Sequence, residues 1–292
     1  MRLGVSLILC NLLGALTLAV TRYFSGERIF NVWIFFVLVT ASLAGCLAAL
    51  YLLRKPWDLE RFTRQFILLI FFTYLGLTFG AFVQHFAGNA ASQPTAMRAL
   101  VGTLSFQGVT LLLLPPFLRE HGEAFRNAFG FTVNWKMAVL FGVLAACAFM
   151  PVGELLQMAS SKFLSQLNMT PEVQPAVEAM KNSSALFDRI ILAVVAILLA
   201  PLGEEILFRG ILYPTIKRYG FPRLALWGTS LLFAAIHVNL LTFVPLFLFA
   251  MVLGLLYQKT GNLLAPITAH AMFNVLNFVK FLIFEASMKN PG

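Results

Sequence analysis

Long uninterrupted apolar segments recur along the whole chain and constrain its fold more than any other feature. The sequence of 292 residues is 60% hydrophobic and only 11% charged, whereas a soluble domain carries about 25% charged residues. A run of about 18 or more apolar residues is long enough to cross a hydrocarbon core about 30 Å thick as a helix. The sequence therefore predicts an all-α protein, a polytopic bundle of transmembrane helices.

Eight or nine segments are long and apolar enough to be membrane helices. They are residues 3–21, 30–53, 66–86, 99–118, 137–158, 188–213, 224–241, 243–258 and 262–284. The first has no small-residue cleavage pattern, so we interpret it as a retained span and not as a secretory signal. Residues 243–258 suit a full crossing or a re-entrant segment equally, because Pro245 follows soon after His237.

The formal net charge of +9 is best explained by membrane topology. Basic residues gather at 54–64, 119–136 and 217–223, which are alternate loops. Because cytoplasmic loops accumulate Lys and Arg, this pattern predicts a cytoplasmic N-terminus. Basic and aromatic residues are not interleaved as in nucleic-acid-binding proteins, so the expected partner is the lipid bilayer and not a nucleic acid.

A long polar stretch, residues 159–187, divides the chain. It separates an N-terminal set of about five spans, residues 1–158, from a C-terminal set of about four, residues 188–287. The N-terminal set carries few polar groups, and the sequence assigns it no role. Within it, Glu154 lies near a span end and is interpreted as structural, and the Pro115-Pro116 pair predicts the end of a helix or a kink.

The C-terminal set places charges at membrane depth, in "LAPLGEEILFRG" (199–210). Only 14 uncharged residues run from 190 to 203, and as a helix they cover about 21 Å, too little to cross the membrane. The span must therefore continue through Glu204, Glu205 and Arg209. A charge at a helix centre costs about 2.5 to 3.5 kcal/mol, so water or a partner must face each of these side chains.

One partner is local. Glu205 and Arg209 are four residues apart with the acid first, which favours an ion pair on one helix face. Glu204 points about 100° away and keeps no such mate. Pro201 leaves the carbonyl of Ile197 without its usual donor, so we expect a kink, and a cavity, beside the unpaired carboxylate.

Two further apolar segments supply imidazole and amide groups. His237 lies in "FAAIH", within a stretch free of charged residues, and His270, Asn274 and Asn277 follow at i, i+4 and i+7 on one helix face. Such groups can simply join helices by hydrogen bonds. Ionisable groups inside a membrane are, however, more often functional.

These residue types suit hydrolysis of an acyl bond by water. A carboxylate beside an imidazole can remove a proton from water, and a second His with an Asn one turn away offers donors to an oxyanion. No Ser or Cys stands out as a nucleophile. Glu204, His237 and His270 also match the ligands of a catalytic zinc site, although a His-Glu-x-x-His helix is absent. The cofactor stays open between a divalent metal such as zinc and none.

The segments "EEILFR", "FAAIH" and "HAMFN" resemble the three motifs of the CPBP family, the CAAX prenyl endopeptidase and bacteriocin-processing proteases, also called Abi. The spacer "TGNLLAPITAH" is also similar to that of bacterial members. The resemblance covers residues 188–285. It implies an all-helical intramembrane endopeptidase, acting on a hydrophobic, lipidated or membrane-associated peptide in the cytoplasmic membrane of a bacterium.

The resemblance also implies roles for individual residues. Glu204 and His237 would activate the water, His270 and Asn274 would stabilise the oxyanion, and Glu205 and Arg209 would support the site. Bacterial relatives are associated with bacteriocin maturation or self-immunity, so a non-catalytic scaffold or immunity protein is the alternative. A proton-coupled transporter ranks lower, because the two related halves of many transporters are not visible.

Overall fold

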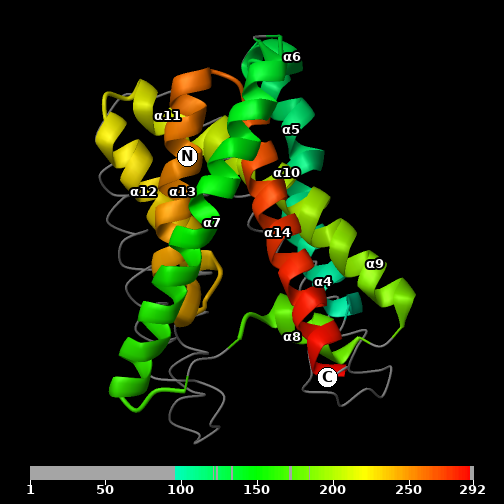
Figure 1. Cartoon of the computed structure of the whole chain (residues 1–292). Coiled ribbons are helices and arrows are strands. Elements are labelled where there is room, and N and C mark those ends of the chain that lie inside the picture. The colour runs from blue at the N-terminus through cyan, green and yellow to red at the C-terminus, as the bar shows by residue number, and fades with distance from the viewer. Residues whose placement is uncertain are drawn as a thin grey trace, which may run out of the picture. The chain divides into compact units, whose positions relative to one another are not determined.

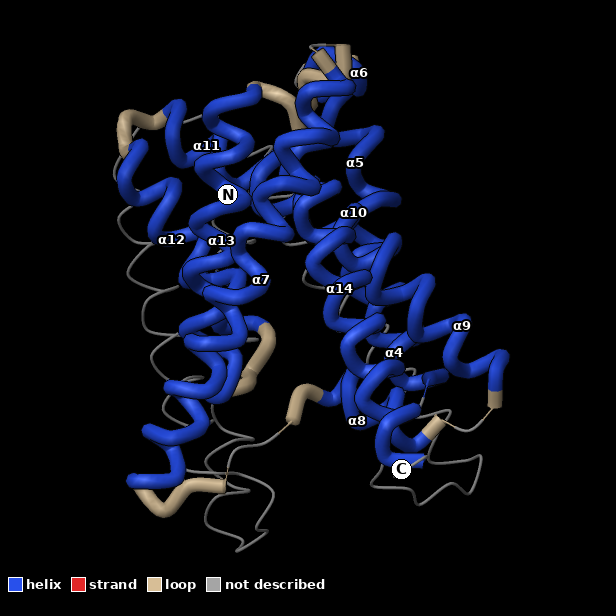
Figure 2. The backbone as a smooth tube through the Cα atoms, viewed as in Figure 1, coloured by secondary structure: helices blue, strands red, loops and turns tan. Residues whose placement is uncertain are grey.

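The computed structural model describes residues 96–289, apart from 121, 123, 133, 171, 172 and 184, and all regular structure in this part is helical. The α-helices are α4 (Ala96–Thr103), α5 (Val109–Glu120), α6 (Phe125–Ala128), α7 (Trp135–Gln166), α8 (Pro175–Asn182), α9 (Leu186–Val194), α10 (Ala200–Glu205), α11 (Tyr213–Arg218), α12 (Pro222–Ile236), α13 (Leu240–Thr260) and α14 (Leu264–Lys289) (Figures 1 and 2). Three π-helical segments join some of them: η1 (Leu104–Gly108), η2 (Val195–Leu199) and η3 (Ile206–Leu212). The predicted spans 3–21, 30–53 and 66–86 lie outside the described residues.

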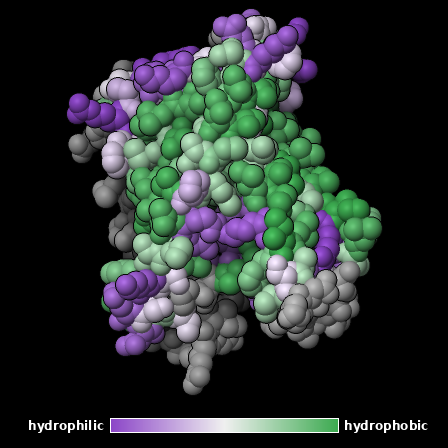
Figure 3. Space-filling model, viewed as in Figure 1, coloured by the Kyte–Doolittle hydropathy of each residue, from purple (hydrophilic) through white to green (hydrophobic). Residues whose placement is uncertain are grey.

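The chain is an integral membrane protein. Within the described residues, four helical stretches are long and apolar enough to cross a membrane: Trp135–Gln166, Leu186–Arg218, Leu240–Thr260 and Leu264–Met288. Large apolar side chains cover much of the surface between the hydrophilic areas (Figure 3), as expected where lipid is the solvent. Four of the predicted spans are thereby confirmed as membrane-length helices, and the total of eight or nine stays a prediction.

The helix predicted at 224–241 is wrong at its C-terminal boundary. The helix α12 ends at Ile236 after 15 residues, which cover about 22 Å and fall short of the hydrocarbon core. Val238 has a positive φ of 47°, and the side chain of Asn239 accepts a hydrogen bond from the Thr242 N–H at 3.0 Å. This cap starts α13, whose 21 residues have the length of a full crossing.

The polar stretch 159–187 is partly helical. The helix α7 continues into it as far as Gln166, and α8 occupies Pro175–Asn182. Pro115 and Pro116 lie inside α5 and do not end it. Both prolines are exposed on the surface of this helix.

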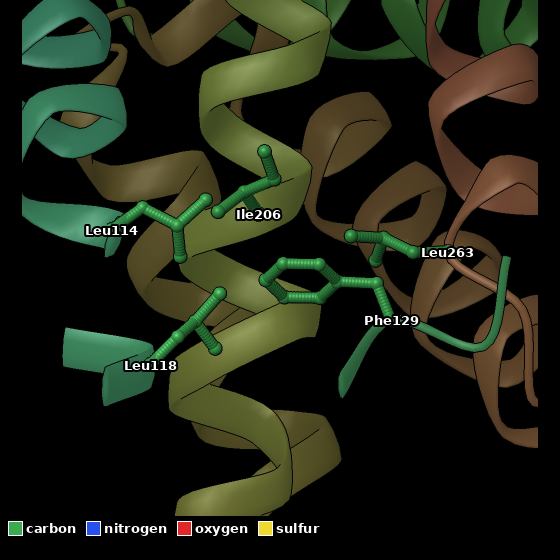
Figure 4. Packing of buried hydrophobic residues seen from close by; sticks show 5 residues of the cluster. All are labelled: Leu114, Leu118, Phe129, Ile206 and Leu263. Carbon is green, nitrogen blue, oxygen red and sulfur yellow. The ribbon is translucent and has the colours of Figure 1, made fainter. Parts of the chain in front are cut away.

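An apolar cluster fixes one end of the bundle: Leu114, Leu118, Phe129, Ile206 and Leu263 (Figure 4). The Phe129 carbonyl accepts a hydrogen bond from the Leu263 N–H at 2.9 Å. Gly130, with φ +68°, lies so close to Gly261 that an added Cβ would overlap its carbonyl oxygen. The segment before α7 is thereby locked against the start of α14 and against η3.

The helix α14 packs along α7 and also contacts α13, α10 and η2. A Cβ at Gly142 of α7 would lie 2.6 Å from the Ala265 carbonyl oxygen of α14, so only glycine allows this approach. Small residues commonly permit such close contacts between membrane helices. This packing positions the part of α14 that carries His270 and Asn274.

Candidate active site

Five polar side chains meet inside the bundle, from four helical segments distant in the sequence. They are Gln107 of η1, Glu204 and Glu205 of α10, Arg209 of η3 and His270 of α14, and we call them the central polar network. Each is at most 8% exposed. The charges predicted at membrane depth therefore lie inside the protein, facing partners, as the cost of burying them requires.

The helix that carries the carboxylates is widened on both sides of them. In η2 the Ala200 N–H donates to the Val195 carbonyl, a five-residue step. If the next hydrogen bond kept the same five-residue step, the Ala196 carbonyl would accept from the N–H of residue 201, but Pro201 has no N–H. The Asn274 Nδ2 supplies it instead, 2.7 Å from the Ala196 oxygen. The expected kink thus takes the form of a π-helical turn, a feature frequent at functional sites.

A second π-helical segment, η3, follows the carboxylates and carries Arg209. The predicted ion pair is confirmed: Arg209 Nη1 lies 2.8 Å from Glu205 Oε1. Arg209 Nη2 donates to the Ala250 carbonyl of α13 at 2.9 Å, and the guanidinium carbon lies 4.8 Å from the ring centroid of Phe233. The guanidinium therefore ties η3 to both neighbouring helices, α12 and α13.

Glu204 has a different environment from Glu205. Its Oε1 accepts a hydrogen bond from Gln107 Nε2 at 2.9 Å, and its Oε2 lies 3.9 Å from His270 Nε2. This Oε2 is buried without a hydrogen-bond partner among the described residues. The sequence correctly predicted that Glu204 has no basic partner on its own helix. It did not predict the contact with Gln107, because a single glutamine in an apolar span forms no recognisable pattern.

His270 links the two carboxylates. Its Nδ1 lies 2.9 Å from Glu205 Oε1, so this nitrogen donates to the carboxylate, and its Nε2 faces Glu204. The ring packs edge-on against Phe233 and Phe249, with centroids 5.6 and 5.9 Å apart. Aromatic walls and a carboxylate thus fix the orientation of this imidazole.

His237 lies beside this group without joining it. Its Nδ1 is 2.7 Å from the Phe233 carbonyl oxygen, and its ring packs on the Phe233 ring, which also contacts His270. In the described part of the chain, no hydrogen bond or ion pair joins His237 to Glu204 or His270. Of the residues predicted for the site, the structure therefore joins Glu204, Glu205, Arg209 and His270 directly.

Glu204, His237 and His270 are the possible ligands of a metal ion. Glu204 and His270 bring an oxygen and a nitrogen to 3.9 Å, but among the described residues no group of three or more His, Cys, Asp or Glu side chains is arranged to hold a metal ion. A catalytic zinc site needs three protein ligands. The described residues do not supply that set.

Comparison with known proteins gives the family of the C-terminal part. Residues 186–276 match the family described as type II CAAX prenyl endopeptidase Rce1-like. Over 83 residues the chain is 39% identical to "Uncharacterized protein YpbD" of Bacillus subtilis (strain 168), covering 27% of this chain and 40% of that protein. Over 124 residues it is 32% identical to "Uncharacterized 24.3 kDa protein" of Escherichia coli, covering 41% of this chain and 57% of that protein. No solved structure matches the chain.

The matched residues run from α9 into α14 and include every predicted site residue, while Gln107 lies outside them. The chain spans roughly half the length of the two bacterial relatives. Residues 186–276 therefore form a domain of the Rce1-like type II CAAX prenyl endopeptidase family.

Proposed function

We propose that the protein is an intramembrane endopeptidase that hydrolyses a peptide bond of a hydrophobic, lipidated or membrane-associated peptide. The observation that carries the proposal is the buried pair formed by Glu204 and His270, whose free Oε2 and Nε2 atoms face each other at 3.9 Å. The family match supports the same reaction class. The other acid of the network, Glu205, is neutralised by its ion pair with Arg209, whereas Glu204 Oε2 and the Nε2 of a neutral His270 ring are left as two proton acceptors.

One water molecule can bind both acceptors at once. Two acceptor atoms 3.9 Å apart can each lie about 2.8 Å from the same water oxygen. In the proposed reaction Glu204 takes a proton from this water as its oxygen attacks the scissile carbonyl carbon. Glu204 then returns the proton to the leaving amine, so the step needs no nucleophilic Ser or Cys.

His270 is proposed to orient the attacking water. The Nε2 of its neutral ring accepts a hydrogen bond from this water and then from the hydroxyl of the tetrahedral intermediate, while Nδ1–H donates to Glu205, which fixes the ring as a carboxylate does behind a catalytic histidine in hydrolase triads. A role of His270 in stabilising the oxyanion stays a prediction from the family motifs. Asn274 spends one amide hydrogen on the Ala196 carbonyl and keeps a second for the oxyanion. A water-activating role for His237 stays a prediction from the family motifs.

The basic residues support a membrane orientation. Arg119 ends α5, Lys217 and Arg218 end α11, and Lys259 ends α13. The contacts of Phe129 with Leu263 and of Tyr213 with Tyr257, whose ring centroids are 6.2 Å apart, bring these helix ends to the same side of the bundle. We assign this side to the cytoplasm of a bacterial cell.

The test compares membrane proteomes of cells that make the parent or Glu204→Gln at equal levels. A peptide terminus that appears with the parent and vanishes with Glu204→Gln would support proteolysis and identify the substrate. The matched control is Glu154→Gln, an acid of another membrane helix that pairs with Lys280 on the surface. It should leave the terminus intact.

The alternative functions predict other outcomes. A non-catalytic scaffold or immunity protein would give the same termini with and without the Glu204 carboxylate, and Glu204→Gln would still complement a deletion strain. A proton-coupled transporter would lose proton-driven uptake in Glu204→Gln while generating no new termini. Either result would overturn the proposed hydrolysis.

A further inference from the structure

A glutamine outside the family domain reaches the centre of the candidate active site. Gln107 lies in η1, 97 residues before Glu204 in the chain, and its Nε2 donates to Glu204 Oε1 at 2.9 Å. The side chain is buried, and its own Oε1 has no hydrogen-bond partner among the described residues. Because an ionised carboxylate only accepts hydrogen bonds, the amide nitrogen is the group that must face Glu204.

The backbone is shaped for this contact on both sides. A Cβ at Gly203 would lie 2.5 Å from Gln107 Cβ and 3.0 Å from Gln107 Cα, so a larger residue would push η1 away from α10. Gln107 itself sits in a π-helical turn, and Thr110 Oγ1 donates to the Phe106 carbonyl there at 2.9 Å. The close approach of η1 and α10 therefore depends on glycine at 203 and brings the amide within reach of the carboxylate.

The hydrogen bond distinguishes the two oxygens of Glu204. With Oε1 held by Gln107, only Oε2 remains to face His270 Nε2 at 3.9 Å. A carboxylate without this bond could rotate about its terminal torsion, which is broad and roughly two-fold. Rotation would move the basic oxygen away from the water that it shares with His270.

We infer that Gln107 is a positioning residue that holds the Glu204 carboxylate in the orientation needed to activate water. The inference rests on the proposed hydrolysis. It assigns a part in the site to the helical segment before α7, which the family domain does not include. If Gln107 only joined η1 to α10, its loss would lower the stability of the protein but would not change the orientation of the Glu204 carboxylate.

The test replaces the amide while keeping the volume. Gln107→Met preserves the length of the side chain and its helix propensity, and Gln107→Asn keeps the amide but draws it back by one methylene. Thr110→Val is the matched control, one turn further along the same helix, with a hydroxyl that bonds only its own helix. All three are compared with the parent in intact membranes at equal amounts of folded protein.

Two readouts are measured. The first is the initial rate at which the Glu204-dependent peptide terminus appears. It should fall about 10- to 100-fold in Gln107→Met and Gln107→Asn, the range seen when hydrogen bonds that orient metal-ligating carboxylates and histidines are removed, and stay at the parental value in Thr110→Val. The second is the infrared band of the Glu204 carboxyl, isolated by subtracting the Glu204→Gln spectrum. This band should shift in both Gln107 variants and not in Thr110→Val.

The outcomes separate the inference from the proposed function. A parental rate and an unshifted band in Gln107→Met would overturn the inference and leave the hydrolysis standing. An equal fall of the rate in Gln107→Met and Thr110→Val would also overturn it, since the helix alone would then matter. If the parent generates no Glu204-dependent terminus, the proposed function fails and the inference fails with it, whatever the infrared band shows.

Discussion

Among the described residues, the central polar network and the peripheral ion pairs both join helices, and they differ in their access to the surface. In the central polar network the Arg209 and Glu205 side chains are 1% and 0% exposed. The peripheral ion pairs are Glu154 with Lys280 and Arg189 with Glu285, whose side chains are 36%, 52%, 22% and 24% exposed. The first set has all its partners inside the protein, whereas the second can reach the membrane interface by extending its side chains.

The buried charges of the central polar network cost free energy on folding, and the pairing of these charges need not repay it as stability. Burial of charges costs several kcal/mol per ion, and a buried ion pair often stabilises no more than apolar residues of the same volume. The central polar network is therefore poorly explained as a device that holds the helices together. Its carboxylate oxygen and imidazole nitrogen, which face each other at 3.9 Å, are the groups that the proposed hydrolysis uses, and the peripheral ion pairs have no counterpart to them.

Loss of Arg209 should have the largest effect. Arg209→Met leaves Glu205 and its contact with His270 without the buried cation, and breaking a buried pair in this way costs about 3–5 kcal/mol. The free energy of unfolding in mixed detergent micelles measures it. The double variant with Glu205→Leu should recover part of the loss, because no unpaired charge remains. If Arg209→Met lowered the free energy of unfolding by less than about 1 kcal/mol, the Glu205–Arg209 pair would contribute no more than the peripheral ion pairs.

A smaller effect should follow when the network is displaced without altering its side chains. Gly142→Ala places a Cβ 2.6 Å from the Ala265 carbonyl oxygen, just before His270 on α14. We expect a loss of about 1–3 kcal/mol from overpacking and slower formation of the peptide terminus. The control is Gly228→Ala, whose Cβ meets only the flexible Leu224 side chain at 3.5 Å. Equal stability of the two variants would show that α7 does not position α14.

Asn274 makes an uncharged interhelical contact, so its loss should cost less than the loss of a charge in the central polar network. Asn274→Leu removes the donor to the Ala196 carbonyl, and such interhelical hydrogen bonds contribute about 0.6 to 2 kcal/mol in membranes. Asn277→Leu is the control, since its amide bonds the Phe273 carbonyl of the same helix. Thermal unfolding in detergent should separate them. If both variants unfold alike, the π-helical turn does not depend on Asn274.

The sequence predicted those parts of the site that depend on local spacing. Glu205 and Arg209 form their pair because four residues bring two side chains to one helix face. The apolar lengths correctly predicted helices at residues 137–158, 188–213, 243–258 and 262–284. Local rules decide these features, so no knowledge of the distant chain was needed.

The parts that the sequence missed depend on contacts between distant segments. Gln107 approaches Glu204 only because η1 packs on Gly203, and nothing near residue 107 indicates this. The bond between Glu205 and His270 joins positions 65 apart. The end of α12 before His237 was also missed, because the cap at Asn239 acts through its side chain and an apolar sequence on both sides conceals it.

The smallest effect is expected at the surface, from Glu154 and Lys280. Glu154→Gln and Lys280→Gln should each change the free energy of unfolding by no more than about 1 kcal/mol, because each remaining charge can turn toward the interface. The charge-reversed double variant, Glu154→Lys with Lys280→Glu, should restore the parental value, since the pair is defined by its charges alone. No such exchange is expected to work for Glu205 and Arg209, where Ala250 and His270 fix the place of each group. A full recovery there would remove the distinction between the two sets of contacts.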